Sequence, residues 1–283
     1  LKDASYTTCA RGKDDWLLRA SSLSIDRETG VGTARNARLE FKGVPILYSP
    51  WLTYPVDGRR RSGLLLPDFG SGGQRGVEVA VPYYFNLAPD HDATFTPHYM
   101  SKRGLQAQGE FRYLSESTKG TLNGEFLPGD DVTGEDRALV YWYNQSQLND
   151  RWRATIDGTQ VSDSAYFEDL ATGLGSASQT HLRQRVDFEY FDSTWSALLR
   201  LEDYQTLDDS LTAAERPYQR LPQVAVNGYW PDNPLGLEYR LQSELTYFNR
   251  DIGTTGLRAN LRPQIALPLR FGALSLESAA AFD

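Results

Sequence analysis

The chain has 283 residues, with 29 Lys and Arg against 37 Asp and Glu, a net charge of −8, and one Cys. The acidic balance argues against a nucleic-acid partner, which needs a basic surface, and the single Cys excludes an internal disulfide framework and a cysteine-based zinc site. No apolar run approaches the roughly 18–20 residues of a spanning helix, and the start, Leu1 to Ala4, does not resemble a signal peptide. A helical membrane protein is therefore excluded, whereas a membrane β-barrel is not, because barrel strands alternate and are polar on average.

The first part of the chain predicts a small β domain and a stiff connection. Residues 15–25 and 31–42 are expected to be short β segments. Residues 43–62 differ because they hold three prolines and a run of arginines: Pro45, Pro50, Pro55 and Arg59-Arg60-Arg61. Prolines at this density stiffen a connection and deny it ladder hydrogen bonds. We expect a β domain over 1–42, a Pro-rich connector over 43–62 and a barrel from 63 to 283.

From residue 63 onwards, apolar and polar residues alternate with a period of two, as in Leu105 to Tyr113. About 12 strands are expected, near 63–69, 76–85, 92–101, 104–115, 119–128, 137–148, 151–162, 181–192, 194–205, 218–230, 236–249 and 256–270. Most exceed the usual ~5–6-residue strand and fit the ~9–11 residues of a tilted strand that crosses a bilayer. The predicted fold class is all-β, with long antiparallel meander strands.

The connections between these strands differ on the two sides. One set is tight, for example Asn149-Asp150, and the alternate set is mostly longer and polar, for example Ser162 to Thr180, with the short loop Ser101 to Arg103 as an exception. This asymmetry is typical of outer-membrane barrels. The polar set within the strands is rich in Arg, Glu, Gln and Asp, which predicts a wide hydrated lumen. A soluble β-sandwich with one solvated face is the alternative.

Two prolines fall inside the first two expected barrel strands, Pro67 after Leu64 to Leu66 and Pro82 between Val77 and Phe85. Proline lacks an N–H and is normally kept to strand edges and bulges. A membrane barrel tolerates no open edge, because an unsatisfied backbone group in lipid costs several kcal/mol. The residues alone allow two interpretations: a weak ladder that opens sideways into the membrane, or bulges or strand-end positions without a gating role.

Candidate chemical sites are weak. Asp90-His91-Asp92 with His98 could form a metal or acid–base site, but Asp90 and His91 lie in an expected turn. Asp130-Asp131 and Glu135-Asp136 could hold calcium, but the spaced ligand pattern is missing, which favours a solvated loop. No nucleophile elbow, phosphate loop or zinc motif is present. We expect no enzyme, no metal and no cofactor.

Specific strings occur in a fixed order along residues 6–115. They include Tyr6-Thr7-Thr8-Cys9, Asn36-Ala37-Arg38, Val44-Pro45-Ile46-Leu47-Tyr48-Ser49-Pro50, Arg60-Arg61-Ser62-Gly63, Pro82-Tyr83-Tyr84, Thr96-Pro97 and Glu110-Phe111-Arg112-Tyr113-Leu114. This series resembles the LptD family, the outer-membrane lipopolysaccharide-assembly proteins of Gram-negative bacteria. The resemblance continues more loosely, through strand pattern and loop order, to the end of the chain.

The resemblance implies a periplasmic β-jellyroll, here represented by its C-terminal part, that leads into a large outer-membrane barrel. It implies the lipoprotein LptE as a plug, the periplasmic bridge protein LptA as a neighbour, and lipopolysaccharide leaving through a seam between the first and last strands. Pro67 and Pro82 match family prolines in the first two strands, which favours the gating interpretation. Cys9 matches a family cysteine that forms a disulfide with a partner near the end of the barrel.

The chain also departs from the family pattern, because it has only Cys9 and ends at Ala281-Phe282-Asp283 within an expected further strand. We therefore expect a segment of a longer protein. The predicted function is a translocon component that inserts lipopolysaccharide into the outer leaflet, in contact with outer-membrane lipid. A passive porin or siderophore-type receptor barrel is the alternative, and an outer-membrane hydrolase that uses Asp92 and His98 is a third.

Overall fold

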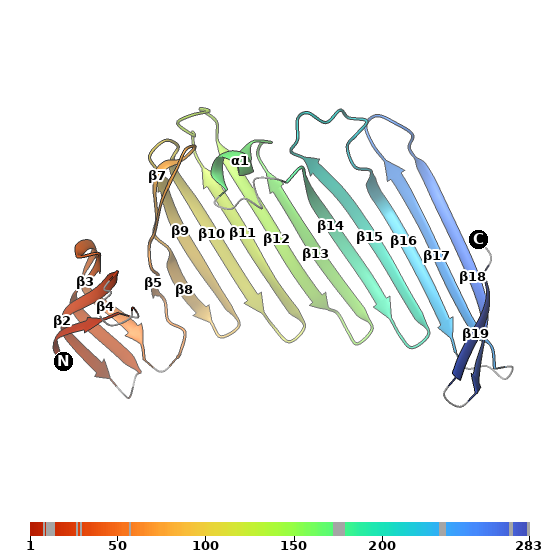
Figure 1. Cartoon of the computed structure of the whole chain (residues 1–283), viewed down its shortest axis with the longest axis horizontal. Coiled ribbons are helices and arrows are strands. Elements are labelled where there is room, and N and C mark those ends of the chain that lie inside the picture. The colour runs from red at the N-terminus through yellow and green to blue at the C-terminus, as the bar shows by residue number, and fades with distance from the viewer. Residues whose placement is uncertain are drawn as a thin grey trace. The chain divides into compact units, whose positions relative to one another are not determined.

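The computed structural model describes residues 1–7, 9, 15–26, 28, 30–56, 58–171, 179–231, 236–271 and 274–281. Within them the chain is almost entirely antiparallel β structure, as predicted, with one short helix, α1 (Tyr166–Leu170) (Figure 1). It divides into two compact units. The first comprises Leu1–Leu66 and Pro82–Pro89, and the second comprises Pro67–Val81 and Asp90–Asp283. No helix in the described part of the chain has the length and apolar character needed to cross a membrane.

The first unit contains a four-stranded antiparallel sheet in the order β1-β2-β3-β4. Its strands are β1 (Lys2–Tyr6), β2 (Trp16–Asp26), β3 (Val31–Phe41) and β4 (Val44–Pro55). Ala20, Ala34 and Ala37 form its small core, against which Leu18, Leu52 and Tyr54 pack. The unit also holds the short strand β5 (Gly63–Leu64), which pairs with β8 (Tyr83–Ala88).

Strand β4 corrects the expected connector over 43–62. Its twelve residues pair with β3 from Val44 to Pro55, so ladder hydrogen bonds exist where the prolines predicted none. The physical reason is position: β4 is the last strand of its sheet, and an edge strand tolerates proline because one side of its backbone has no ladder to complete. The connection between β4 and β5 is therefore only residues 56–62.

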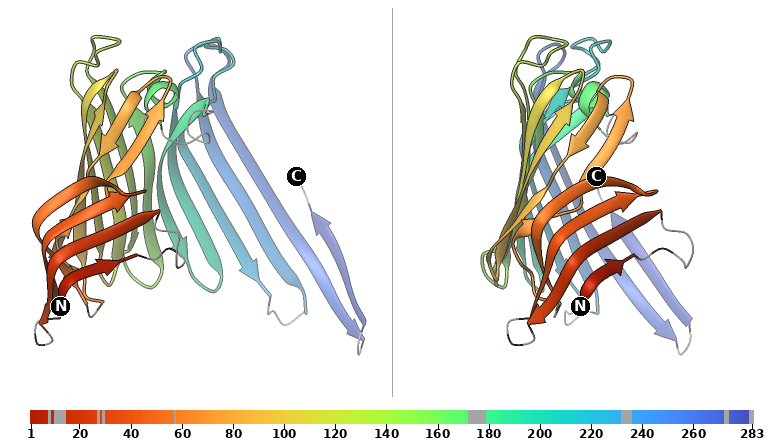
Figure 2. Two further views of the ribbon diagram at one scale, coloured as in Figure 1. Left: turned by 60° about the vertical axis from the view of Figure 1, so that its left-hand side comes forward. Right: turned by 90° about the vertical axis from the view of Figure 1, so that its left-hand side faces the viewer.

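The second unit is a single antiparallel sheet of thirteen described strands in the order β6-β7-β9-β10, continuing through to β19 (Figures 1 and 2). The strands are β6 (Asp68–Gly72), β7 (Gly76–Ala80), β9 (His91–Met100), β10 (Gly104–Leu114), β11 (Thr118–Leu127), β12 (Arg137–Gln147), β13 (Trp152–Val161), β14 (His181–Phe191), β15 (Trp195–Thr206), β16 (Gln219–Trp230), β17 (Glu238–Asn249), β18 (Gly256–Phe271) and β19 (Leu274–Ala281). From β9 onwards every strand pairs with its neighbours in sequence, which is the meander predicted from the alternation.

From β9 to β18 the predicted strand boundaries agree with the structure to within two residues. The first two predicted strands, 63–69 and 76–85, are wrong in one respect, because each region is broken into two short strands. Strand β19 begins where the sequence analysis expected a further strand, and α1 was not expected. The two sides keep their asymmetry, with short turns at one end of the strands and longer connections, including the one that carries α1, at the other (Figure 1).

The register sorts the alternating residues onto two faces. Polar residues meet polar residues across the ladders, as in Asp92 with Arg112, Asp157 with Arg185 and Asp187 with Arg200. We call this side the polar face. The residues between them form the apolar face, and many of its large side chains are exposed: Phe95, Leu122, Val140, Phe188, Leu199, Leu245 and Leu261.

Candidate functional site

The first strands are broken at the two prolines that the sequence analysis singled out. Pro67 lies between β5 and β6, and Pro82 lies between β7 and β8. Proline cannot donate a backbone hydrogen bond, and each of the two prolines lies directly before a strand, Pro67 before β6 and Pro82 before β8. Within the first unit the Pro82 carbonyl still accepts a hydrogen bond from the Leu65 N–H at 2.9 Å. The structure thus places both prolines at strand ends.

The ladders around these breaks are short. β5 and β8 share two residue pairs, β6 and β7 share five, and β7 and β9 share three, whereas β9 and β10 share ten. A third proline contributes: the Val81 N–H donates to the Pro97 carbonyl at 3.1 Å, but Pro97 has no N–H to return the bond. The beginning of the sheet therefore has fewer backbone hydrogen bonds than its middle.

A chain of polar side chains on the polar face ties the β6–β7 hairpin to the sheet. Glu78 accepts from Arg75 at 2.8 Å and lies 3.0 Å from His98 Nε2, while His98 Nδ1 lies 3.2 Å from Gln106 Oε1. Glu78 has room because Gly70 carries no side chain; an added Cβ there would lie 2.5 Å from the carboxylate. His98, considered above for acid–base chemistry, is 4% exposed and is held between these partners.

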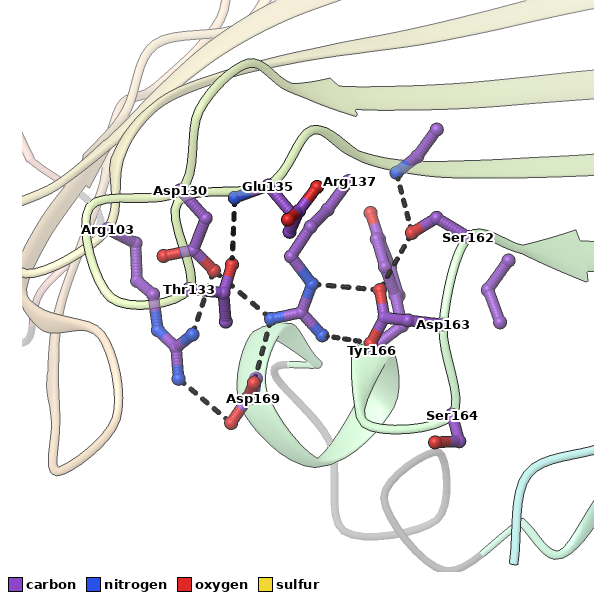
Figure 3. A network of polar contacts seen from close by, with 12 residues as sticks. Arg103, Asp130, Thr133, Glu135, Arg137, Ser162, Asp163, Ser164, Tyr166 and Asp169 are labelled. Carbon is purple, nitrogen blue, oxygen red and sulfur yellow. Dashed lines mark hydrogen bonds and ion pairs between the residues drawn. The ribbon is translucent and has the colours of Figure 1, made fainter. Parts of the chain in front are cut away.

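A second polar cluster lies on the loop side of the sheet and holds α1 in place (Figure 3). We call it the loop-side cluster: Arg103, Arg137, Asp130, Asp163 and Asp169. Arg137 bonds Asp163 through two nitrogens at 2.6 and 2.9 Å and Asp169 at 2.7 Å. Both arginines contact Asp130, at 2.8 Å from Arg103 and 3.1 Å from Arg137. Arg103 also contacts Asp169 at 2.8 Å.

The two arginines and Asp130 form the buried centre of the cluster, whereas the side chains of Asp163 and Asp169 are 37% and 17% exposed. The side chains of Arg103 and Arg137 are each 2% exposed, and that of Asp130 is fully buried. Burial alone would raise the pKa of Asp130, but the hydrogen bonds from the Val132 N–H, Arg103 and Arg137 hold that pKa below its ordinary value. The pKa of Asp163 is lowered in the same way, against its burial, by Arg137 and Ser162. Both carboxylates are therefore charged at neutral pH, as their arginine partners require.

Helix α1 completes this side of the unit. Its Tyr166 donates to Glu125 at 2.7 Å and accepts from Gln106 at 3.0 Å, which seats the helix on the polar face. Tyr166 and Leu170 belong to an apolar core with Met100, Leu127, Leu139, Val161, Leu182 and Leu207. The Arg75 guanidinium also donates to the Ala171 carbonyl at 2.5 Å, so the β6–β7 hairpin contacts the same connection.

The sequence analysis missed this cluster because its members are spread over 66 residues and no local motif joins them. One signal was available: Arg103 and Arg137 border loops on the same side, and the long loops there contain Asp130, Asp163 and Asp169. Opposite charges at neighbouring strand ends can pair once a meander brings them together.

The other residues considered as chemical sites do not come together in one site. His91 is the first residue of β9 and not part of the expected turn; it lies 2.8 Å from Asp90, at the opposite end of the strand from His98. Asp92 pairs with Arg112 at 2.8 Å. In the acidic loop, Asp136 accepts from the Gly129 N–H while Asp130 is held by arginines. Among the described residues no group of three or more His, Cys, Asp or Glu could hold a metal ion.

Cys9 is half-buried, and its N–H donates to the Thr7 hydroxyl at 3.1 Å. The residues on either side of it lie outside the described part of the chain. The expected disulfide of Cys9 stays a prediction, because its partner would belong to another part of the protein.

Family models match almost the whole chain. The model described as LPS transport system D matches residues 135–283, and the model described as LptD protein matches residues 33–155.

Individual relatives carry the name LPS-assembly protein LptD. The chain is 42% identical to the protein from Nitrosococcus oceani over 95% of its own length and 37% of the relative's. It is 40% identical to one from Pseudomonas aeruginosa over 89% of its length and 28% of the relative's. It is 39% identical to one from Nitrosospira multiformis over 95% of its length and 30% of the relative's. The chain thus spans about a third of the length of these relatives.

Among solved structures, the outer membrane channel DcaP of Acinetobacter baumannii overlaps with 94% of this chain and 84% of its own, at 11% identity and a TM-score of 0.34. A score this low does not establish a shared fold.

Proposed function

The chain belongs to the LptD family, and from this premise we propose that it is part of an outer-membrane machine that delivers lipopolysaccharide to the outer leaflet. In this proposal the second unit is the first part of a barrel wall, and the four-stranded sheet is the C-terminal part of a periplasmic jellyroll. The protein acts as a transport component and not as an enzyme. The name shared by its relatives favours this function over a passive porin or receptor.

The observation that carries the proposal is the contrast between the two faces of the second unit. The apolar face exposes rows of large side chains, for example Leu257 and Leu261, which are 64% and 62% exposed. Such a surface is unfavourable in water and suits contact with lipid tails. The polar face carries ion pairs, for example Arg200 with Asp187 at 2.8 Å and Arg153 with Glu189 at 2.7 Å. That face suits a hydrated lumen through which sugars can pass.

The broken first strands supply the second part of the proposal. Lipid tails can leave a barrel only where its wall parts, and the least costly place to part is where the fewest backbone bonds are lost. Pro67 and Pro82 mark such a place, and we assign them a role in a lateral gate. Lipopolysaccharide would then reach the membrane sideways while its sugars remain in water.

The remaining assignments follow from family membership alone. The first unit lies in the periplasm, where the bridge protein LptA would hand over lipopolysaccharide. The lipoprotein LptE would occupy the lumen, next to the polar face. Cys9 would form a disulfide with a cysteine outside this chain. The role of the loop-side cluster rests instead on its contacts: through Asp163 and Asp169 it keeps α1 on the polar face, which in this proposal is the end of the lumen opposite to the short turns.

Photo-crosslinking in living cells tests the proposal. A photoreactive residue in place of Leu66, which is 75% exposed beside the broken strands, is expected to form an adduct with lipopolysaccharide. The matched control replaces Leu199, which is 41% exposed on the apolar face in the middle of the sheet, where only background labelling is expected. Equal labelling at the two positions, or none at Leu66, contradicts a lateral gate at the first strands.

A further inference from the structure

The connection between β4 and β5 concentrates positive charge in an acidic protein. Arg59, Arg60 and Arg61 follow one another and are all exposed. Residues 58–66 and 82–89, which form this end of the first unit, contain no Asp or Glu, although the chain as a whole has a net charge of −8. We call Arg59, Arg60 and Arg61 the connector arginines. Asp57 precedes this run in the sequence, so the local excess is two positive charges, which still attracts an anion.

Hydrogen bonds hold the backbone of this run against β8. The Asn86 side chain donates to the Arg60 carbonyl at 3.1 Å, and the Asn86 N–H donates to the Ser62 hydroxyl at 2.8 Å. The Arg60 guanidinium donates to the Pro89 carbonyl at 2.5 Å. These bonds hold the chain at Arg60 and Ser62, which lowers the entropy lost when the connector arginines bind a ligand.

An apolar surface follows directly along the chain. Leu64, Leu65 and Leu66 are 52%, 47% and 75% exposed, and on the paired strand β8 the side chains of Phe85 and Leu87 are also exposed. The first unit thus carries a cationic segment and, a few residues further, an exposed apolar one. This order matches an amphipathic lipid, whose charged head adjoins its hydrocarbon chains.

We propose that the connector arginines bind the phosphates of a lipid whose head group carries more than one phosphate, while Leu64 to Leu66 contact its acyl chains. Arginine is suited to this task because its planar guanidinium donates to two phosphate oxygens at once. Three adjacent positive charges complement a multiply phosphorylated head better than the single charge of an ordinary phospholipid. The inference rests on the proposed function and names a contact for its lipid cargo, lipopolysaccharide.

The test uses the full-length protein in detergent, with a photoreactive residue at position 66 and purified lipopolysaccharide. The double variant R59Q/R61Q is expected to reduce the adduct by about tenfold, because two charge-assisted contacts are lost. R59K/R61K keeps the charge and is expected to retain most of the adduct. The control K119Q/R151Q removes two exposed positive charges from turn-side positions of the second unit and is expected to leave the adduct unchanged.

Competition identifies the source of the phosphate. Unlabelled lipopolysaccharide is expected to suppress the adduct, whereas enzymatically dephosphorylated lipopolysaccharide, phosphatidylglycerol and inorganic phosphate are expected to compete at least tenfold less well. Equal competition by phosphatidylglycerol would assign the arginines to bulk membrane lipid and overturn the inference, as would equal competition by inorganic phosphate. An adduct that is the same in R59Q/R61Q and wild type overturns the inference alone. Absence of any adduct in the wild type contradicts the proposed function as well.

Discussion

The first strands and the middle of the sheet follow the same alternation of residues, yet the two regions are stabilised differently. Between β9 and β18 neighbouring strands share long, nearly continuous ladders, such as the ten pairs of β11 with β12. Strands β5 to β8 are two to six residues long; Pro67 lies between β5 and β6, and Pro82 lies between β7 and β8. Each missing backbone bond removes about 0.5–1.5 kcal/mol of net stabilisation. A few proline positions therefore suffice to make one end of a uniform wall easier to part.

The loop-side cluster adds to this difference. Its buried ion pairs join Arg103, between β9 and β10, to Arg137 on β12 and to the connection that carries α1. The β6–β7 hairpin is bonded to the same region through backbone carbonyls: Arg103 donates to that of Gln74 at 3.1 Å, Lys102 to that of Gly73 at 2.7 Å, and Arg75 to that of Ala171 at 2.5 Å. The middle of the wall is thus joined at its loop side by buried ion pairs, while the first hairpin is joined there by hydrogen bonds to neutral acceptors.

The largest expected effect comes from removing Arg137. Arg137→Met removes the arginine partner of Asp163, which is 37% exposed, and one of the two arginine partners of Asp130 and of Asp169, which are more buried. Breaking a fully buried pair typically costs about 3–5 kcal/mol. We expect the free energy of unfolding of the full-length protein in detergent to fall by up to about this amount, with earlier protease cleavage within 162–171. Arg216→Gln, at an exposed loop position, serves as the control and should change neither. An R137M protein as stable as the wild type contradicts a stabilising role for the cluster.

The next largest effect concerns the weak region. Pro67→Ala together with Pro82→Ala restores two backbone donors and should stabilise the first strands by about 1–3 kcal/mol. Opening would then slow by about one order of magnitude, and lipopolysaccharide should reach the cell surface more slowly. Hydrogen exchange over residues 63–70 and 80–86 measures the gained protection, and Pro217→Ala in a loop is the control. Stronger protection from hydrogen exchange with an unchanged rate of lipopolysaccharide delivery to the surface would contradict a lateral gate at the first strands.

The contrast between these regions also explains what the sequence could predict. Strands 91–271 were predictable because alternation, length and turn residues agree within each of them, as in Leu105 to Tyr113. The breaks at Pro67 and Pro82 were foreseen as weaknesses, but their extent depends on which neighbour each backbone group faces. Strand β4 was missed because proline content alone does not show that a strand lies at an edge. Asp130 was expected in a solvated loop but is fully buried, because its partners Arg103 and Arg137 come near it only after the sheet forms.

A smaller effect is expected at the turn side. Trp195 and Trp230 pack edge to face with ring centroids 4.9 Å apart on paired strands. A double-mutant cycle with Trp195→Ala and Trp230→Ala should give a coupling of about 0.5–1.5 kcal/mol in the free energy of unfolding. Gly228 provides a further check, since an added Cβ would lie 2.3 Å from the Trp230 ring. Gly228→Ala should therefore displace that ring and abolish most of the coupling. Full coupling in the G228A background would mean that the ring contact is not its source.

The smallest effect is expected from mild acid, and its sign follows from the lowered pKa values of Asp130 and Asp163. A carboxyl group whose pKa is lowered by folding stabilises the folded state fully above its unfolded pKa of about 3.9, and that stabilisation is lost as the pH falls through the folded pKa. A spin label is placed at Glu168 on α1, in a Cys9→Ser background. Its mobility should therefore stay low and unchanged from pH 8 to about pH 5 and should rise only below about pH 4. A label at Glu116, in the exposed turn between β10 and β11, reports changes unrelated to the cluster. Mobility that rises at Glu168 already between pH 7 and pH 5 would show that another group, and not these two aspartates, holds α1 on the polar face.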